Sequence, residues 1–255
     1  MPARPLSHPL CLSRLSEARD MGGAEGAVDP LRAAIAIATN HRPTLKPEAI
    51  LKQLDMYAHQ AQPMLAHKNN ALVGVVNHVL FDRQGFTGNR EQYSDPLNSY
   101  MDEVLKRRRG LPILLALVFV ETANRAAMLA GRADVAHGIG LPGHFVAAVD
   151  VAGDEDQRVY VDAFGAGEIL SADDCRELVV SHGAGWRDAY LEPVTGEAWA
   201  LRMLTNLKNV YLEMHDVANA AATLEQMLVI EPSRPRHNEL VQLYQVIDKH
   251  IARNN

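Results

Sequence analysis

A histidine and an aspartate stand at the ends of two short apolar segments. His144 follows Pro142-Gly143 and precedes the run FVAAVD, and Asp162 closes the run VYVD. Both runs are rich in valine, so we expect two adjacent strands that bring the imidazole and the carboxylate together. In enzymes that use a cysteine or serine nucleophile, such a pair supplies a histidine base held in place by a carboxylate.

The nucleophile that this chemistry requires is missing from its expected place. A reactive cysteine is best placed in the first turn of a helix, where the helix dipole lowers the thiol pKa. Gly110-Leu111-Pro112 predicts such a helix start. However, no Cys, Ser or Thr lies between Arg109 and Glu121. Without a nucleophile, His144 and Asp162 form a hydrogen-bonded pair that carries out no covalent chemistry.

The two cysteines of the chain, Cys11 and Cys175, suggest neither a disulfide framework nor a zinc motif. Cys175 falls in the first turn of a helix predicted by the capping box that starts at Ser171. It is a candidate for a relocated nucleophile, although an ordinary residue of a capping segment is the simpler interpretation. His137, His144 and His182 fit no metal-ligand spacing, so we expect no metal and no cofactor.

Three further elements are predicted to position these residues. The segment Ile113–Ala130 is apolar on nearly every side and predicts a helix that is buried through most of its length. Strands are predicted over His137–Val151 and Arg158–Ala163, joined by a turn at residues 153–156.

Composition narrows the range of functions. Of 255 residues, 47% are hydrophobic and 22% are charged, which is typical of a soluble globular protein. The net charge of −6 argues against a general nucleic-acid binder. The longest apolar run, Leu111–Val120, has about half of the roughly 18 residues that a membrane span needs. We therefore expect a cytoplasmic protein that binds neither nucleic acid nor a membrane.

The residue pattern divides the chain into four parts. Residues 1–29 contain several prolines and glycines and predict a flexible leader with a short helix near Leu12–Arg19. Residues 30–80 predict a helical N-terminal segment, and residues 81–194 carry the candidate site. Residues 195–255 predict three helices, the first two resembling one tetratricopeptide unit. Because one unit cannot bury its own apolar face, we expect this arm to pack on the middle domain or on a second copy in a homo-oligomer.

Several segments together resemble the SirB-type transglutaminase-like protein family. They are residues 85–89 with Tyr93, residues 98–100, 104–105 and 107–112, residues 141–145, residues 161–162 with Phe164 and Gly167, and residues 170–175. The resemblance extends over about Thr44 to Ile251 and includes the tetratricopeptide-like arm. It implies an α+β fold: a transglutaminase-like, papain-like core with a small antiparallel sheet, a helical N-terminal segment and a helical C-terminal arm.

The same resemblance assigns roles to residues. His144 and Asp162 match the histidine and aspartate of the family's triad, and members like this one commonly lack the cysteine. The family helix is close to GIPITLS, whereas this chain has GLPILLA, so Leu114 and Ala116 replace Thr and Ser. The matched segments also contain the residues that we expect to bind a ligand: Asn98, Arg109, Gly110, Pro112, Pro142, Gly143 and Phe145.

Three interpretations remain open at this stage. The first is a non-catalytic binding or regulatory protein, a pseudoenzyme that uses a degenerate papain-like cleft and the helical arm to hold a protein or peptide partner. The second is a hydrolase or acyltransferase in which Cys175 or an activated water attacks beside His144 and Asp162. The third is an interaction scaffold that works through the C-terminal arm. For His144 itself, the simplest interpretation is that it donates to Asp162 to fix a strand corner.

Overall fold

The computed structural model describes residues 6–20, 28–67, 71–151 and 158–254. The chain forms two compact units, each assembled from segments far apart in the sequence. Residues 1–45, 94–101 and 195–255 form what we call the helical unit, and residues 46–93 and 102–194 form the mixed unit.

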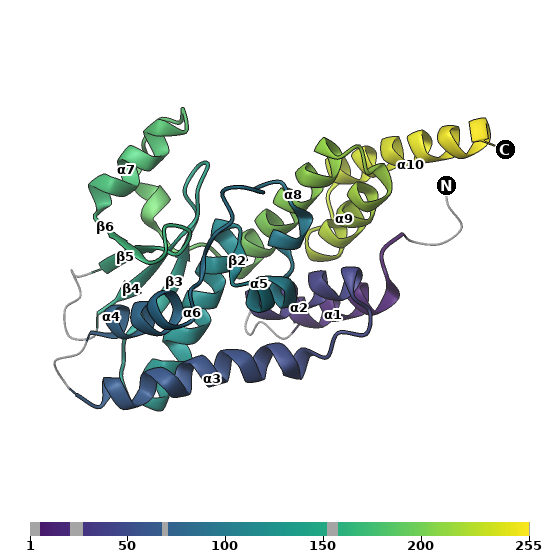
Figure 1. Cartoon of the computed structure of the whole chain (residues 1–255). Helices are drawn as coiled ribbons and strands as arrows, with labels where there is room; N and C mark the ends of the chain where they lie inside the picture. Colours follow the sequence, from purple (N-terminus) through teal and green to yellow (C-terminus); the bar gives the residue numbers. More distant parts are fainter. Residues whose placement is uncertain (1–5, 21–27, 68–70, 152–157, 255) are drawn as a thin grey trace. The chain divides into compact units, whose positions relative to one another are not determined.

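The helical unit is built from α1 (Pro9–Asp20), α2 (Pro30–His41), the short 3-10 helix η2 (Pro96–Ser99), α8 (Gly196–Glu213), α9 (Val217–Ile230) and α10 (Arg234–Asn254) (Figure 1). Within this unit, α9 packs against α8, α10 and α1, and α2 packs against α1 and α8. The three helices of the expected arm therefore share one unit with the first two helices of the chain.

Part of the segment expected to be a flexible leader is packed. Helix α1 covers the expected short helix, and its residues Cys11, Leu15 and Ala18 are fully buried. The backbone N–H of Ser7 donates to the Glu225 carboxylate at 2.6 Å. These buried side chains recur at helical spacing, a pattern that the prolines and glycines around them obscured. Residues 1–5 and 21–27 lie outside the described residues.

The mixed unit combines helices with a small antiparallel sheet. Its helices are α3 (Pro47–Leu65), α4 (Leu72–Asn77) with the following π-helix η1 (His78–Arg83), α5 (Met101–Arg107, in this unit from Asp102), α6 (Pro112–Leu129), α7 (Ala172–Ser181) and the 3-10 helix η3 (Asp188–Leu191). The sheet has the order β3 (Val135–Ile139), β4 (Val146–Asp150), β5 (Arg158–Asp162) and β6 (Glu168–Leu170). The two-residue strand β1 (Thr87–Gly88) pairs in parallel with β2 (Arg109–Gly110). The described chain is thus mostly helical with small sheets.

The single strand predicted over His137–Val151 is wrong, because the structure forms a hairpin of β3 and β4 there. Pro142 has no N–H for a strand ladder, and Gly143 adopts a φ of 76°, which favours glycine. His144 follows in the turn, where its backbone N–H donates to the Leu141 carbonyl at 3.2 Å. The predicted turn at residues 153–156 lies outside the described residues.

Helix α6 lies at the centre of the mixed unit and contacts β3, β4 and α3. In Figure 1 the sheet lies between α6 and α7. Among the described helices, α6 alone is long and apolar enough to cross a membrane, and 72% of its 18 residues are buried inside the protein. The helix predicted over Ile113–Ala130 is confirmed, and the apolar run Leu111–Val120 forms only its first part. Burial of this extent is typical of a core helix.

Candidate functional site

The centre of the candidate site is the contact between His144 and Asp162. The His144 Nε2 atom lies 3.0 Å from the Asp162 Oδ1 atom, and each side chain is only 9% exposed. Because a carboxylate can only accept, a hydrogen bond in this pair requires the proton on His144 Nε2. The turn before β4 supplies the imidazole, and the end of β5 supplies the carboxylate.

The Asp162 carboxylate lies in a cradle of backbone amides. The Phe164 N–H donates to Asp162 Oδ1 at 2.9 Å, and the Gly165 N–H also donates to the carboxylate. Burial raises the pKa of Asp162, but the hydrogen bond and charge of His144 and the two amides outweigh burial, so the pKa falls below its usual value. The carboxylate is thus kept ionised and fixed in direction.

Two aromatic rings flank the His144 imidazole. The Phe164 ring stands edge-on to it, with the centroids 6.1 Å apart at 82°. The His182 ring, from the C-terminal end of α7, stacks on it with the centroids 6.4 Å apart at 21°. Above Phe164, the Arg90 guanidinium lies 4.9 Å from the ring centroid.

Gly88 connects this histidine site to the entrance of α6. It pairs with Gly110 in the β1–β2 ladder, and its N–H donates to the Phe164 carbonyl at 3.0 Å. A Cβ atom on Gly88 would come within 2.4 Å of the Phe164 ring, so the backbone must be bare at this point. The helix start and the Asp162 corner are therefore bound to the same short strand.

The entrance of α6 is filled by apolar side chains. Leu111 precedes the helix, and Pro112 is its first residue. Ile113, Leu114 and Ala116 are all buried, and none of them carries a nucleophilic atom. The helix that would carry a nucleophile is thus packed as part of the core.

Cys175 is buried on α7, in an apolar cluster that contains Ile139, Val146 and Tyr160. Burial raises the pKa of its thiol to about 12, with a further contribution from the charges of Asp174 and Asp162. The predicted capping box at Ser171 is confirmed. It places Cys175 in the first turn of α7, but the burial keeps the thiol protonated.

The seven other residues expected at the site have different positions. Five lie in or beside the segments just described: Gly110 on β2, Pro112 at the start of α6, and Pro142, Gly143 and the buried Phe145 around His144. Arg109 is exposed on β2 and lies 3.8 Å from Glu91. Asn98 belongs to η2 of the helical unit, where it is buried.

The prediction from sequence missed the role of His182 and of Gly88. His182 was considered only as a metal ligand, and within the described residues no group of three His, Cys, Asp or Glu side chains could hold a metal ion. A signal for Gly88 was present, because residues 85–89 belong to the matched segments. The close approach of Phe164 to it required the fold.

The segments that form this site fall within the part of the chain that matches a known family. A family model described as transglutaminase-like superfamily matches residues 48–205, which include β1, the α6 entrance, His144 and Asp162. The chain belongs to the transglutaminase-like superfamily. The match ends inside α8, so it spans the mixed unit from α3 to η3 and the first part of the helical arm.

Curated relatives of this transglutaminase-like chain come from bacteria and animals. A UPF0162 protein of Xylella fastidiosa is 32% identical over 169 residues, which are 64% of this chain and 57% of the relative. A UPF0162 protein of Vibrio cholerae is 24% identical over 82% of this chain and 76% of its own length. Human F-box only protein 21 is 32% identical over 44% of this chain and 18% of its own length. The chain spans little more than half the length of the Xylella relatives. No solved structure matches the chain.

Proposed function

We propose that this chain is a SirB-type, non-catalytic transglutaminase-like protein that binds a protein or peptide partner in the cytoplasm. In this proposal the core is a degenerate papain-like one, and the ligand lies against His144. The observation that carries the proposal is the buried 3.0 Å contact of His144 with Asp162, combined with a segment from Arg109 to Glu121 that contains no Cys, Ser or Thr. A histidine so oriented, without a nucleophile, can bind and orient a polar group but cannot form an acyl intermediate.

The partner class follows from the family and from the surroundings of the histidine. Transglutaminase-like and papain-like cores act on peptide side chains or backbones, and the exposed Arg90 guanidinium, which lies over the buried Phe164 ring, offers N–H donors to such a chain. The carbonyl groups of a peptide would find a complementary group there.

A peptide library tests this proposal directly. The full chain is immobilised beside a His144→Gln variant and a His137→Gln variant, which changes the second His–Asp pair of the same sheet. We expect some peptides to be retained by the wild type and by His137→Gln but released by His144→Gln. Equal retention by all three proteins, or turnover of a glutamine-donor or amide peptide that disappears in His144→Gln, would contradict the proposal.

The alternative is a hydrolase or acyltransferase in which Cys175 or an activated water attacks. The Cys175 version has little support, since the thiol is buried and its pKa is raised to about 12. Iodoacetamide at pH 8 should therefore label Cys175 of the folded protein about 10³-fold more slowly than a free thiol with a pKa of about 8.5. Labelling faster than a free thiol would revive this version.

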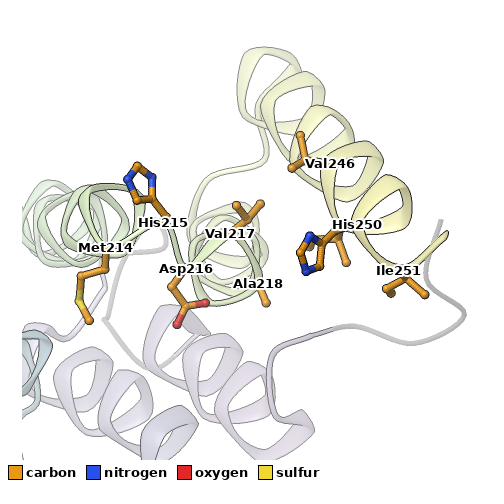
Figure 2. A pocket seen from close by; sticks show the side chains of 9 residues that line it. Met214, His215, Asp216, Val217, Ala218, Val246, His250 and Ile251 are labelled. Atoms are coloured by element: carbon orange, nitrogen blue, oxygen red, sulfur yellow. The ribbon is translucent and has the colours of Figure 1, made fainter. Parts of the chain in front are cut away.

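The helical arm is the second contact surface that we propose. We take α8 and α9 as a tetratricopeptide-like hairpin that binds a partner or a second copy. In support, a pocket of about 500 Å³ lies between the α8–α9 turn and the last turns of α10. Figure 2 shows His250 pointing from α10 toward the start of α9, with Met214, Val246 and Ile251 around the pocket. These three apolar side chains are all about half exposed, at 54%, 49% and 53%.

Point substitutions suit this surface better than deletion of the arm, because α8 and α9 pack against α2 and α1 within one unit. Met214→Lys and Ile251→Lys change exposed positions. We expect them to weaken capture of a partner, or self-association measured by sedimentation, while the thermal unfolding temperature remains that of the wild type. Leu212→Lys, on the same helix end but outside the pocket lining, is the matched control.

A further inference from the structure

His144 is buried although it lies in a turn. It is 8% exposed, and two rings lie beside it, Phe164 edge-on and His182 stacked on it. A ligand that approaches the imidazole on either of these sides must displace the ring there. The two rings differ in how they are held.

Phe164 is fixed by its own backbone. Its N–H donates to the Asp162 carboxylate at 2.9 Å, and its carbonyl accepts from the Gly88 N–H at 3.0 Å. The ring also packs so closely on Gly88 that a Cβ atom there would clash with it. A shift of the Phe164 backbone would therefore break the cradle that holds Asp162, and rotation of the ring would give up its packing on Gly88.

His182 is attached only to its own helix and to the surface of the turn. Its Nδ1 atom donates to the Leu178 carbonyl of α7 at 2.7 Å, and the side chain is exposed. Its contact with the site is packing: a Cβ atom on Gly143 would come within 2.5 Å of the ring. The residue caps the C-terminus of α7 and is followed by Gly183 at a φ of 79°. Rotation of this ring gives up its bond to Leu178 but breaks no hydrogen bond to the turn or to Asp162.

We propose that His182 is a lid over His144, closed in this structure, and that it must swing off Gly143 before a ligand can reach the imidazole. The lid explains why position 143 is glycine: any side chain would occupy the place of the ring and would be strained at a φ of 76°. As a lid for ligand entry, the proposal rests on the proposed function, whereas the covering of His144 by His182 can be tested without any ligand.

Diethylpyrocarbonate, which modifies histidine nitrogen, is the probe. The full chain and its variants are treated briefly, and the initial modification rate of each histidine is measured by peptide mass spectrometry. His137, which lies in the middle of β3 opposite Ala148, is the internal reference. If the open state is a minor one of about 10% or less, removal of the lid should raise the His144 rate at least about tenfold.

The variants separate the ring from the rest of the side chain. We expect His182→Ala to raise the His144 rate and His182→Phe, which keeps a ring over Gly143, to retain the wild-type rate. His182→Gln can still donate to Leu178 but has no ring, and should behave like the alanine variant. The proposal is overturned if His144 reacts equally fast in all four proteins, or if His137 accelerates to the same extent, since that indicates general loosening. Failure of the peptide-library experiment would leave these rates unchanged, so the two proposals fail separately.

Discussion

The four-stranded sheet carries two His–Asp pairs with almost the same geometry and different surroundings. His144 and Asp162 lie 3.0 Å apart, and His137 and Asp150 lie 2.9 Å apart. The first pair is 9% exposed on both sides, whereas the side chains of His137 and Asp150 are 29% and 42% exposed. Asp150 also binds Arg158 at 2.6 Å, while Asp162 binds backbone amides.

The difference shows that the distance within a pair does not define a site. The pKa of Asp150 is lowered first by its hydrogen bond to Arg158, with His137 a lesser cause, so its histidine is one of two partners. The pKa of Asp162 is lowered against burial, and His144 is the largest cause that lowers it. A buried carboxylate needs its histidine far more to remain ionised, and the buried histidine needs the carboxylate as its hydrogen-bond acceptor.

The largest effect should come from removing each carboxylate in turn. Asp162→Ala leaves His144 and two backbone amides buried without their acceptor, and we expect a loss of about 3–5 kcal/mol in the free energy of unfolding. Asp150→Ala should cost no more than about 1 kcal/mol, because its partners reach solvent. Urea denaturation of the full chain measures both values.

Equal losses in the two variants would show that burial does not distinguish the pairs. His144→Gln and His137→Gln repeat the comparison from the other side. The order should be the same, with the His144 variant the less stable of the two.

Sequence patterns predicted the helix starts well and the strands around the site less well. Capping residues such as Ser171 and the proline at position 112 mark helix starts through local hydrogen bonding, so they can be recognised without the fold. The pairing of His144 with Asp162 was expected because two valine-rich runs had to be neighbours. The predicted strand over His137–Val151 includes Pro142-Gly143, which form the turn of the β3–β4 hairpin.

The remaining features of the site depend on contacts between distant segments. His182 is 38 positions from His144 by residue number and meets it only because α7 packs across the sheet through Cys175 and Val179. Gly88 needs no side chain only because Phe164 lies above it. No local pattern encodes such contacts, which arise from tertiary packing.

Acid should weaken both pairs, and salt should separate them by a smaller amount. Both aspartates have a folded pKa below the unfolded value of about 3.9, so each contributes stability that is complete above that pH and is lost as the pH falls through the folded pKa. The difference in unfolding free energy between wild type and Asp162→Asn should therefore shrink below about pH 4.

At pH 7 and about 1 M NaCl, the difference for Asp150→Asn should shrink and that for Asp162→Asn should persist, because salt screens exposed charges. Equal salt sensitivity would contradict the assignment of Asp162 to a dry environment.

The smallest effect concerns the Arg90–Phe164 contact, which lies outside the buried pair. The Arg90 guanidinium lies over Phe164, which covers His144, and an exposed contact of this kind contributes about 0.5–1 kcal/mol. Arg90→Ala should lower the free energy of unfolding by that amount in urea denaturation, and Arg83→Ala, an exposed arginine on η1, should leave it unchanged. In the Asp162→Ala background the Phe164 N–H has already lost its acceptor, so the effect of Arg90→Ala on the free energy of unfolding should decrease. In the Asp150→Ala background it should keep its full size. An Arg90 effect of equal size in both backgrounds would mean that the Arg90–Phe164 contact and the Asp162 cradle are independent. The buried pair would then be isolated by the packing around it, and not by a continuous set of contacts from Arg90 through Phe164 to Asp162.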